Sequence, residues 1–352
     1  MLELPGLIDP HVHLREPGAT HKEDFSSGTA AALAGGFTAV LAMPNTQPPI
    51  TDSSSLTLAK AAARSKAYCD YGIYLGASEE NTESAMDLAE EVCGMKMYLD
   101  QTYGPLRLEG LRSLRKHFNA WSVDKPIAIH AEGMSLAASL LYSGLYSRPV
   151  HVCHVSRIEE INLIRSAKEK GFPVTCEVTP HHLFLTEEDI PRLGVGRGEV
   201  RPRLAAPQDR DALWNNIAVI DCFATDHAPH TLTEKDSDDP PPGFPGLETA
   251  LGLFLNAVRE DRLSLDQVVS RMQTNPRKIF HLPEQIDTRI LVDDAEEWIV
   301  HADQLQSRCG WTPFEGMRLV GHVRSVTLRG RQVYDGDNIT VPAGYGTDLM
   351  SL

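Results

Sequence analysis

Histidine and aspartate residues recur along this chain in a pattern that could bind a metal ion. His11 and His13 form a His-x-His pair, and because alternate residues of a strand face the same side, both imidazoles can reach one ion. His130, His154 and Asp226 each stand at the end of a later apolar run. Imidazole nitrogen and carboxylate oxygen are ligands that suit zinc. Any one of these residues could be an ordinary polar group at a strand end, but that explanation does not account for all of them together.

The segments that carry these residues belong to a regular alternation of strand and helix patterns. Short apolar runs are each followed by an amphipathic stretch, such as 22–34, 53–66 and 157–170. Eight units of this kind predict an α/β protein with a (β/α)8 TIM barrel, which takes about 250 residues. The alternative is an open doubly wound sheet, which no glycine-rich phosphate loop supports. The runs are 4–14, 37–44, 71–77, 95–99, 126–131, 150–155, 173–180 and 221–228.

The domain organisation predicted from these patterns is a barrel over 1–281 and a small C-terminal β appendage over 282–352, packed on the barrel. The stretch from 247 to about 280 has a helical pattern, whereas 321–334 alternates apolar and polar residues. Residues 236–245 are rich in Asp, Pro and Gly and predict a loop.

The placement of the metal-type residues follows from the barrel. The C-terminal ends of barrel strands form the mouth where active sites lie, and these residues end the first, fifth, sixth and eighth runs. Lys96 lies in the fourth run between Met95 and Met97. A buried lysine is costly unless it is paired or neutral. It could reach a carboxylate at the rim, or its neutral amine could take up carbon dioxide as a carbamate that bridges two cations, and the residues leave both alternatives open.

Composition and charge exclude several classes of partner. The formal net charge of -15 argues against nucleic acid and anionic membranes. The longest apolar stretch, 31–43, is too short to span a bilayer, which takes about 20 residues. The N-terminus shows no secretory pattern. The six cysteines include no Cys-x-x-Cys pair, which is typical of reduced thiols in a cytoplasmic protein.

Four long motifs resemble those of dihydroorotases, a branch of the amidohydrolase superfamily. They read PGLIDPHVHLREPG at 5–18, AMPNT at 42–46, TDHAPH at 225–230 and PPGFPGLE at 241–248. The similarity runs along nearly the whole chain and is closest to the dihydroorotase domain of CAD. CAD is a multifunctional enzyme that also carries carbamoyl-phosphate synthetase and aspartate transcarbamoylase domains, and the resemblance implies such domains as partners in one polypeptide.

The resemblance implies a zinc centre in which a carboxylated Lys96 bridges two ions. In CAD-type domains a third zinc is also implied. Without the resemblance, Cys153 is interpreted as a buried thiol and Glu177 as a paired acid. The implied ligands are His11, His13 and Asp226 for one ion, His130 and His154 for the other, and His11, Cys153 and Glu177 for the third.

The implied reaction is the reversible cyclisation of N-carbamoyl-L-aspartate to L-dihydroorotate in de novo pyrimidine biosynthesis. In the hydrolytic direction a metal-bridging hydroxide would attack the ring amide. Asp226 would act as the general acid and base that moves the proton to the amide nitrogen.

A substrate with a carboxylate calls for an arginine. Arg15 lies two residues beyond His13 and would point to the same side, where a bidentate pair with a carboxylate is favourable. By resemblance, the carboxylate contact is shared by Asn45 and His230, and the pocket is completed by Arg201 and Pro242. Thr102 would lie in a loop that closes over substrate and reaches the developing oxyanion, and Tyr103 stands where CAD-type loops tend to have phenylalanine.

Two other functions compete with this interpretation. A dihydropyrimidinase or hydantoinase would use the same metal chemistry on uncharged rings, and Arg15 with the motif around Asn45 argues against it. A catalytically inactive scaffold domain is the other alternative, although each implied ligand is present. Because few residues precede His11, we expect a module excised from a larger polypeptide, and a homodimer is the expected assembly.

Overall fold

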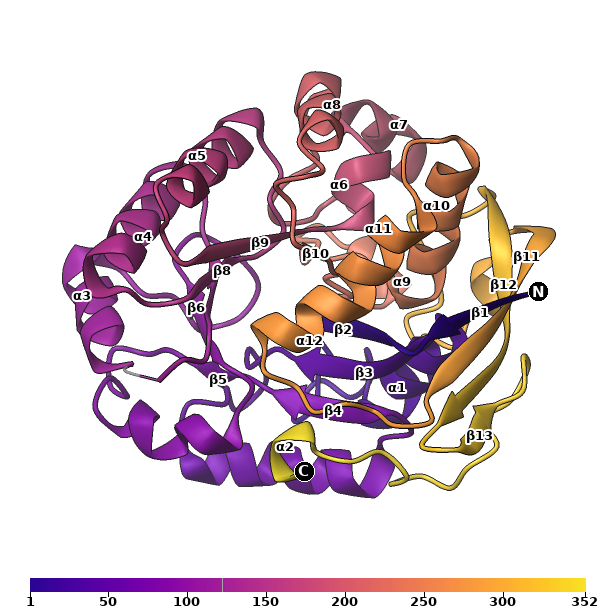
Figure 1. Cartoon of the computed structure of the whole chain (residues 1–352), viewed down its shortest axis with the longest axis horizontal. Coiled ribbons are helices and arrows are strands. Elements are labelled where there is room, and N and C mark those ends of the chain that lie inside the picture. The colour runs from indigo at the N-terminus through magenta and orange to yellow at the C-terminus, as the bar shows by residue number, and fades with distance from the viewer. Residues whose placement is uncertain (122) are drawn as a thin grey trace.

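A ring of short parallel strands lies at the centre of the molecule, and helices surround it (Figure 1). This computed structural model describes residues 1–121 and 123–352. The strands pair in parallel in two sheets, in the orders β10-β9-β8-β7-β6-β5 and β2-β3-β4. Their bounds are β2 (Leu7–Val12), β3 (Phe37–Ala42), β4 (Asp70–Ile73), β5 (Leu75–Gly76), β6 (Met95–Tyr98), β7 (Ile127–His130), β8 (Val150–Val152), β9 (Val174–Val178) and β10 (Cys222–Phe223).

The two sheets join into one barrel at both of their edges. On one side only Tyr74 separates β4 from β5, and its N–H donates to the Ala42 carbonyl over 3.0 Å. On the other side Val12 forms a parallel bridge with His227, and the His13 N–H donates to the His227 carbonyl over 2.7 Å. With β4 and β5 taken as one strand, the eightfold alternation expected from the sequence is confirmed.

The helices follow the strands in turn and cover the outside of the barrel (Figure 1). The predicted helix 53–66 coincides with α2, and 157–170 corresponds to α5 with one residue fewer at each end. The barrel helices are α1 (Phe25–Ala34), α2 (Ser53–Lys66), η1 (Ser84–Glu91), α3 (Gly110–Ala120), α4 (Gly133–Tyr146), α5 (Ile158–Glu169), α6 (Pro180–Phe184), η2 (Glu187–Asp189), α7 (Ile190–Leu193), α8 (Pro207–Asn215) and α9 (Leu232–Lys235).

The stretch after residue 247 is helical, as expected, but it is broken into several pieces. They are α10 (Leu247–Arg259), α11 (Leu265–Val269), the π-helical turn η3 (Ser270–Thr274) and α12 (Asn275–Ile279). Asp261 has a φ of 57°, and a left-handed residue of this kind does not continue a right-handed helix. Ser264 then caps α11 by accepting the Gln267 N–H.

A small antiparallel sheet is attached to the side of the barrel, in the order β1-β11-β12-β13. Its strands are β1 (Leu2–Pro5), β11 (Arg289–Ile299), β12 (Arg318–Leu328) and β13 (Arg331–Tyr334). Of the two short 3-10 turns in this part of the sequence, η4 (Ala302–Gln304) lies between β11 and β12, whereas η5 (Leu349–Ser351) packs against β4 and η1 of the barrel. The appendage therefore draws on both ends of the chain, and the boundary at 281/282 stays a prediction.

The first predicted strand, 4–14, was one run in the sequence but is two strands in the structure. The chain divides at Gly6, where a Cβ atom would lie 2.3 Å from Thr38 Oγ1. This close approach lets the chain leave the small sheet and enter the barrel as β2, which carries His11. No helix in the described 1–121 and 123–352 is long and apolar enough to cross a membrane.

We expect Gly6→Ala to lower the free energy of unfolding by about 1–3 kcal/mol, because the added methyl overpacks the contact with Thr38. Urea unfolding measures the effect. Glu3→Ala, on the exposed side of the same β1 strand, is the matched control and should stay within about 0.5 kcal/mol of the parent. Equal stability of Gly6→Ala and the parent would contradict this account of the strand division.

Candidate metal centre and substrate pocket

The predicted metal-type residues meet at the C-terminal ends of the barrel strands. His11 lies in β2 with His13 just beyond it, and His130 ends β7 as expected. His154 and Asp226 were predicted to end strands, but they lie two and three residues beyond β8 and β10. Their φ angles of 34° and 47° turn them out of the extended ladder and toward the mouth. Such strained backbone is typical of functional sites.

His11, His13 and Asp226 form one compact group. Oδ1 of Asp226 lies 3.2 Å from Nε2 of His11 and 3.0 Å from Nε2 of His13. On its other side the His13 ring contacts Oδ1 of Asn45 through Nδ1, at 2.7 Å. The ligand atoms of the three residues lie close enough together to hold one metal ion.

His130 and His154 form a second group beside the first. Nδ1 of His130 lies 2.9 Å from Nε2 of His154, and the His154 ring centroid lies 5.3 Å from that of His11. The remaining nitrogens, Nε2 of His130 and Nδ1 of His154, are buried without a hydrogen-bond partner. Buried nitrogens of this kind are costly, and a metal ion would satisfy them. The donor set therefore fits a divalent transition metal.

Lys96 is completely buried in β6, as predicted for the fourth run. Its ammonium lies 2.9 Å from Sγ of Cys153 and 5.2 Å from the centroid of the Tyr98 ring. Within the described parts of the chain it forms no ion pair, so the alternative of a lysine reaching a rim carboxylate is not what the structure shows. A covalent change that removed the charge of this amine would relieve the cost of burying it without an ion pair.

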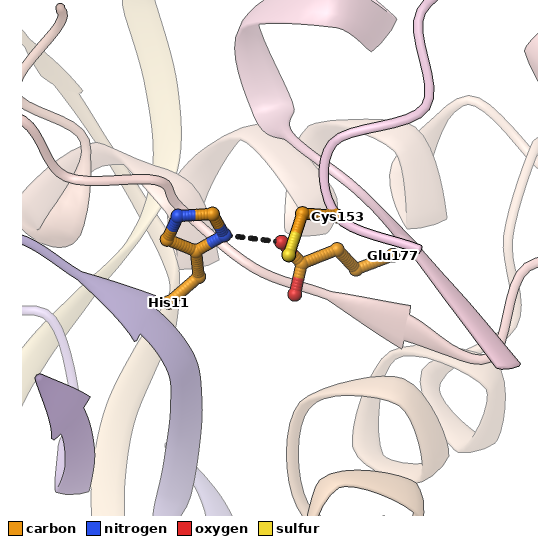
Figure 2. A group of neighbouring side chains, drawn as sticks. All are labelled: His11, Cys153 and Glu177. Atoms are coloured by element: carbon orange, nitrogen blue, oxygen red, sulfur yellow. Dashed lines mark hydrogen bonds and ion pairs between the residues drawn. The ribbon is translucent and has the colours of Figure 1, made fainter. Parts of the chain in front are cut away.

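A third group consists of His11, Cys153 and Glu177 (Figure 2). Oε1 of Glu177 lies 2.5 Å from Nδ1 of His11, and Sγ of Cys153 lies beside the same carboxylate (Figure 2). The other oxygen of Glu177 contacts Nε2 of His151 at 3.0 Å. These atoms could hold an ion, and the Glu177 carboxylate orients the His11 ring.

The electrostatics place the Asp226 carboxylate beside one charged imidazole and two neutral ones. Burial would lower the pKa of His11, but the charges of Asp226 and Glu177 raise it to about 10. Burial alone would raise the pKa of Asp226, but the neighbouring His11 and His13 hold it well below the usual range. Burial lowers the pKa of His13 to about 4, and burial together with Lys96 lowers that of His130 to about 3. At neutral pH these rings keep a lone pair for a metal, and Asp226 can accept a proton.

Asp9 is a positioning residue that the sequence analysis missed. It lies in β2 and accepts hydrogen bonds from the His11 N–H over 3.1 Å and from the Thr225 hydroxyl over 2.5 Å. Burial raises its pKa to about 7 despite these bonds. Asp9 thereby ties the first strand, with His11, to the segment that carries Asp226. A charged residue inside an otherwise apolar run was the available signal.

The predicted substrate residues surround one small cavity at this mouth. It encloses about 20 Å³, room for about one water molecule. Arg15 is buried there, with a φ of 60°, and its Nε donates to the Pro229 carbonyl over 3.0 Å. The lining residues are His11, His13, Arg15, Asn45, Tyr98, Thr102, Tyr103, His130, His154, Arg201, Asp226, Ala228, Pro242 and Gly243.

His230 lies directly behind this lining. Its Nε2 is 3.0 Å from Nη2 of Arg15 and 3.1 Å from the Pro242 carbonyl oxygen. Arg201 lines the cavity and pairs with Glu199 over 2.6 Å. The structure therefore brings all the predicted substrate residues together.

Lys235 is a second residue that sequence reasoning missed, because it stands in a polar stretch with no distinguishing signal. It is completely buried. Its ammonium donates to the carbonyls of Glu199 and Pro241 over 2.7 and 2.9 Å. These carbonyls belong to the loops that carry Arg201 and Pro242, so Lys235 joins two walls of the cavity.

Comparison with known proteins agrees with this geometry. The model of the amidohydrolase family matches residues 3–286. The chain is 53% identical over 351 residues to the multifunctional protein CAD of Squalus acanthias, covering 100% of this chain but only 16% of that protein. It is 34% identical over 359 residues to the dihydroorotase of Pyrococcus furiosus, covering 96% of this chain and 82% of that one.

Two solved structures share the fold. The L-hydantoinase (dihydropyrimidinase) of Arthrobacter aurescens matches with a TM-score of 0.92 at 25% identity, over 99% of this chain and 88% of that one. The inactive dihydroorotase-like domain of a Chaetomium thermophilum CAD-like multifunctional protein matches with a TM-score of 0.85 at 29% identity, over 99% of both. Because one of these neighbours is inactive, function has to be judged on the side chains of the site.

The two hydrogen bonds of the buried Lys235 ammonium predict a pH-dependent contribution to stability. Burial lowers its pKa from 10.5 to about 7, so between about pH 7 and 10 the unfolded chain binds more protons than the folded one. The free energy of unfolding should therefore rise with pH in that window, by up to about 1.4 kcal/mol per pH unit. Urea unfolding at pH 7 and 9 should show this rise in the parent and a smaller one in Lys235→Met. Equal slopes in the two proteins would contradict the prediction.

Proposed function

We propose, from the premise that the chain belongs to the amidohydrolase family and groups with the dihydroorotases within it, that it catalyses the reversible cyclisation of N-carbamoyl-L-aspartate to L-dihydroorotate. In the reverse direction it is a hydrolase that acts on a cyclic amide. This reaction belongs to de novo pyrimidine biosynthesis.

One observation carries the proposal. A single cavity is lined both by the His and Asp groups that could hold metal and by the buried cation of Arg15. The first set suits hydrolysis of an amide, and the second suits a carboxylate on the same small molecule. Dihydroorotate has both features.

The metal ligands we propose are the groups described above, with zinc as the ion and a carboxylated Lys96 as the bridge. The two orphaned nitrogens of His130 and His154 support this assignment. When bound, such ions supply Lewis acidity that polarises a carbonyl and lowers the pKa of water. A third ion near His11, Cys153 and Glu177 is part of the proposal.

Asp226 is the residue we propose as general acid and base. Its carboxylate stays ionised among the imidazoles, and it lines the cavity. Oδ1 of Asp226 would accept the proton of the attacking water and pass it to the departing ring nitrogen. In the biosynthetic direction the same oxygen would take the proton from the carbamoyl nitrogen.

The substrate carboxylate would be held by Arg15, Asn45 and His230, with Arg201 and Pro242 forming the rest of the pocket. Arg15 is fixed by its bond to the Pro229 carbonyl, and a preorganised guanidinium loses little entropy on binding. Thr102 lines the cavity from the loop after β6. We assign it the contact with the oxyanion that develops at the attacked carbonyl.

The hydantoinase alternative is favoured by the fold match alone. A buried arginine facing a neutral ring would lack an anionic partner, and that is costly. The inactive-scaffold alternative follows from the second fold match. It is less favoured, because stability does not require this set of convergent ligands.

The chain's relatives of CAD type are several times longer than the chain itself. We propose that the natural partners are carbamoyl-phosphate synthetase and aspartate transcarbamoylase domains of one polypeptide. In that arrangement this chain would consume the carbamoyl aspartate that the aspartate transcarbamoylase domain makes. The expected location is the cytoplasm, in keeping with six buried free cysteines.

Substrate choice is tested by assaying dihydroorotate and dihydrouracil side by side. We expect hydrolysis of dihydroorotate only, and Arg15→Met should lower kcat/KM by about 10–100-fold through loss of a charged hydrogen bond. Arg203→Met, which removes an exposed arginine near the same mouth, is the matched control and should change little. Activity on dihydrouracil alone would overturn the substrate assignment.

Lys96 is tested by its modification. Protein made with 13C-bicarbonate should show a carbamate carbon resonance, and Lys96→Arg should abolish it. The same variant should lose its bound metal, and its kcat should fall by at least about 10³-fold. Lys125→Arg is the control: it changes a different lysine, one that donates to backbone carbonyls, and should keep the resonance. A fully metallated, active Lys96→Arg enzyme would disprove the bridge.

A homodimer is the assembly we propose, with a second copy covering an apolar patch on the adjacent helices α3 and α4. Leu111, Met134, Leu141 and Leu145 of these helices are 60%, 85%, 55% and 66% exposed. A groove of about 530 Å³ runs along several of them. Exposed apolar patches of this kind typically mark interfaces.

The dimer proposal predicts that Leu141→Glu shifts the protein to monomer in sedimentation velocity, because a buried unpaired charge opposes association. Ile286→Glu, at an exposed apolar residue elsewhere, should leave the dimer intact. A parent protein that sediments as a monomer at micromolar concentration would contradict the proposal.

A further inference from the structure

A buried lysine outside the metal cluster has an unusual set of partners. Lys22 is only 3% exposed. Its Nζ lies 3.0 Å from Nδ1 of His230, 3.1 Å from the hydroxyl of Tyr103 and 3.0 Å from Oε1 of Glu234. The three protons of one ammonium are therefore matched by three acceptors. Of these acceptors, His230 belongs to the substrate pocket and Tyr103 to the loop that covers it.

The contact with Lys22 decides which nitrogen of His230 carries the proton. A lysine ammonium can only donate, so Nδ1 must accept and the proton must sit on Nε2. That N–H faces the Pro242 carbonyl at 3.1 Å, which accepts it. The opposite tautomer could accept from Nη2 of Arg15 over 3.0 Å, but it would point an N–H at the ammonium and a lone pair at the carbonyl. Two satisfied bonds thus favour the Nε2–H form.

This tautomer gives the pocket two donors side by side. Nη2 of Arg15 lies 3.0 Å from Nε2 of His230, and since both carry protons, neither can accept from the other. An anionic oxygen beside them could accept from Arg15 and share the His230 N–H with the Pro242 carbonyl. Burial and the nearby cations of Arg15 and Lys22 keep the pKa of His230 far below its usual range. The ring therefore stays neutral and keeps a fixed proton position.

The same ammonium also contacts the loop that covers the cavity. The hydroxyl of Tyr103 accepts from Lys22, and its ring lies edge-on to His230 with centroids 4.8 Å apart. The Tyr103 carbonyl accepts from Nδ2 of Asn45 over 3.0 Å. With the loop in this position the cavity has room for about one water. Substrate binding therefore requires the lining of the cavity to rearrange, and the Lys22–Tyr103 bond resists a movement of this loop.

We propose that Lys22 is a positioning residue of the substrate pocket, which fixes the Nε2–H tautomer of His230 and holds Tyr103 in the closed loop. The inference rests on the proposed function for the identity of the anion, a carboxylate. The tautomer and the loop contact do not depend on that function. The phenylalanine expected at position 103 in relatives would lack the hydroxyl half of this arrangement.

The tautomer is tested by nitrogen NMR on protein labelled at histidine, with the His230 signals assigned by their loss in His230→Gln. In the parent, Nε2 should carry the proton and Nδ1 should not. In Lys22→Met the two tautomers should mix, whereas Tyr103→Phe should keep the parent pattern. A parent His230 protonated on Nδ1 would overturn the tautomer assignment.

The loop contact is tested by limited trypsin digestion, because Arg107 lies in the same loop with an exposed side chain. Cleavage after Arg107 should become several-fold faster in both Tyr103→Phe and Lys22→Met. Lys66→Met removes a partly exposed lysine that pairs with Glu16 instead, and cleavage should stay at the parent rate. Unchanged cleavage in Tyr103→Phe would overturn the proposal that Lys22 holds the loop through Tyr103.

Kinetics separates positioning from a general loss of structure. Lys22→Met should raise the KM for dihydroorotate by about 10-fold or more, with a smaller change in kcat, because the carboxylate contact is made equally in the ground and transition states. An unchanged KM would overturn the positioning role. If the parent hydrolysed no dihydroorotate but showed the Nε2–H tautomer, the proposed function would fail while the role of Lys22 in fixing His230 stood. Should Lys22→Met fail to fold, the parent tautomer and Tyr103→Phe still decide the outcome.

Discussion

The organisation of this protein depends on one buried carboxylate oxygen. Oδ1 of Asp226 lies within 3.2 Å of two imidazole nitrogens that come from the opposite end of the barrel sequence. An ionised carboxylate is stable at this depth only if cations or strong donors surround it. Without a metal the compensating charge is the His11 proton, because Asp226 and Glu177 raise the pKa of that ring to about 10 despite its burial. His130 and His154 meanwhile each leave a nitrogen without a hydrogen-bond partner. A divalent metal would take the place of the His11 proton and supply positive charge to the whole cluster.

The rest of the barrel mouth is built to keep that cluster in place. Arg15, His154 and Asp226 all adopt left-handed backbone angles, which cost free energy in residues other than glycine. Asp9 and the bridge between Val12 and His227 tie the first strand to the last. Strain at the mouth is thus compensated by packing and hydrogen bonds in the closed ring below it. Around the cluster, Lys22 and Lys235 use backbone and side-chain acceptors to hold the walls of the pocket.

Much of this arrangement could be predicted from sequence, and the misses have physical reasons. The alternation of runs identified the barrel, because eight strands with intervening helices leave few other topologies. The histidine pattern identified the metal-type cluster, since strand ends of a barrel converge. The division at Gly6 was missed because a close approach to Thr38 depends on a residue far away in the chain. The roles of Lys235 and Lys22 were missed for the same reason: their partners come from distant loops, and a lysine among polar residues looks exposed. Tyr103 showed only as a departure from the family pattern, and its hydrogen bond to Lys22 gives that departure a meaning.

The central claim is that the His and Asp cluster is a divalent metal centre. The most direct measurement is a titration of metal-free protein with Co²⁺, followed by the visible absorption of the bound ion, which reports its coordination. The account predicts saturable binding of at least two ions per chain, with intense bands of low coordination number, and loss of tight binding in Asp226→Ala. Absorption that stays at that of free aqueous Co²⁺ throughout the titration would contradict it.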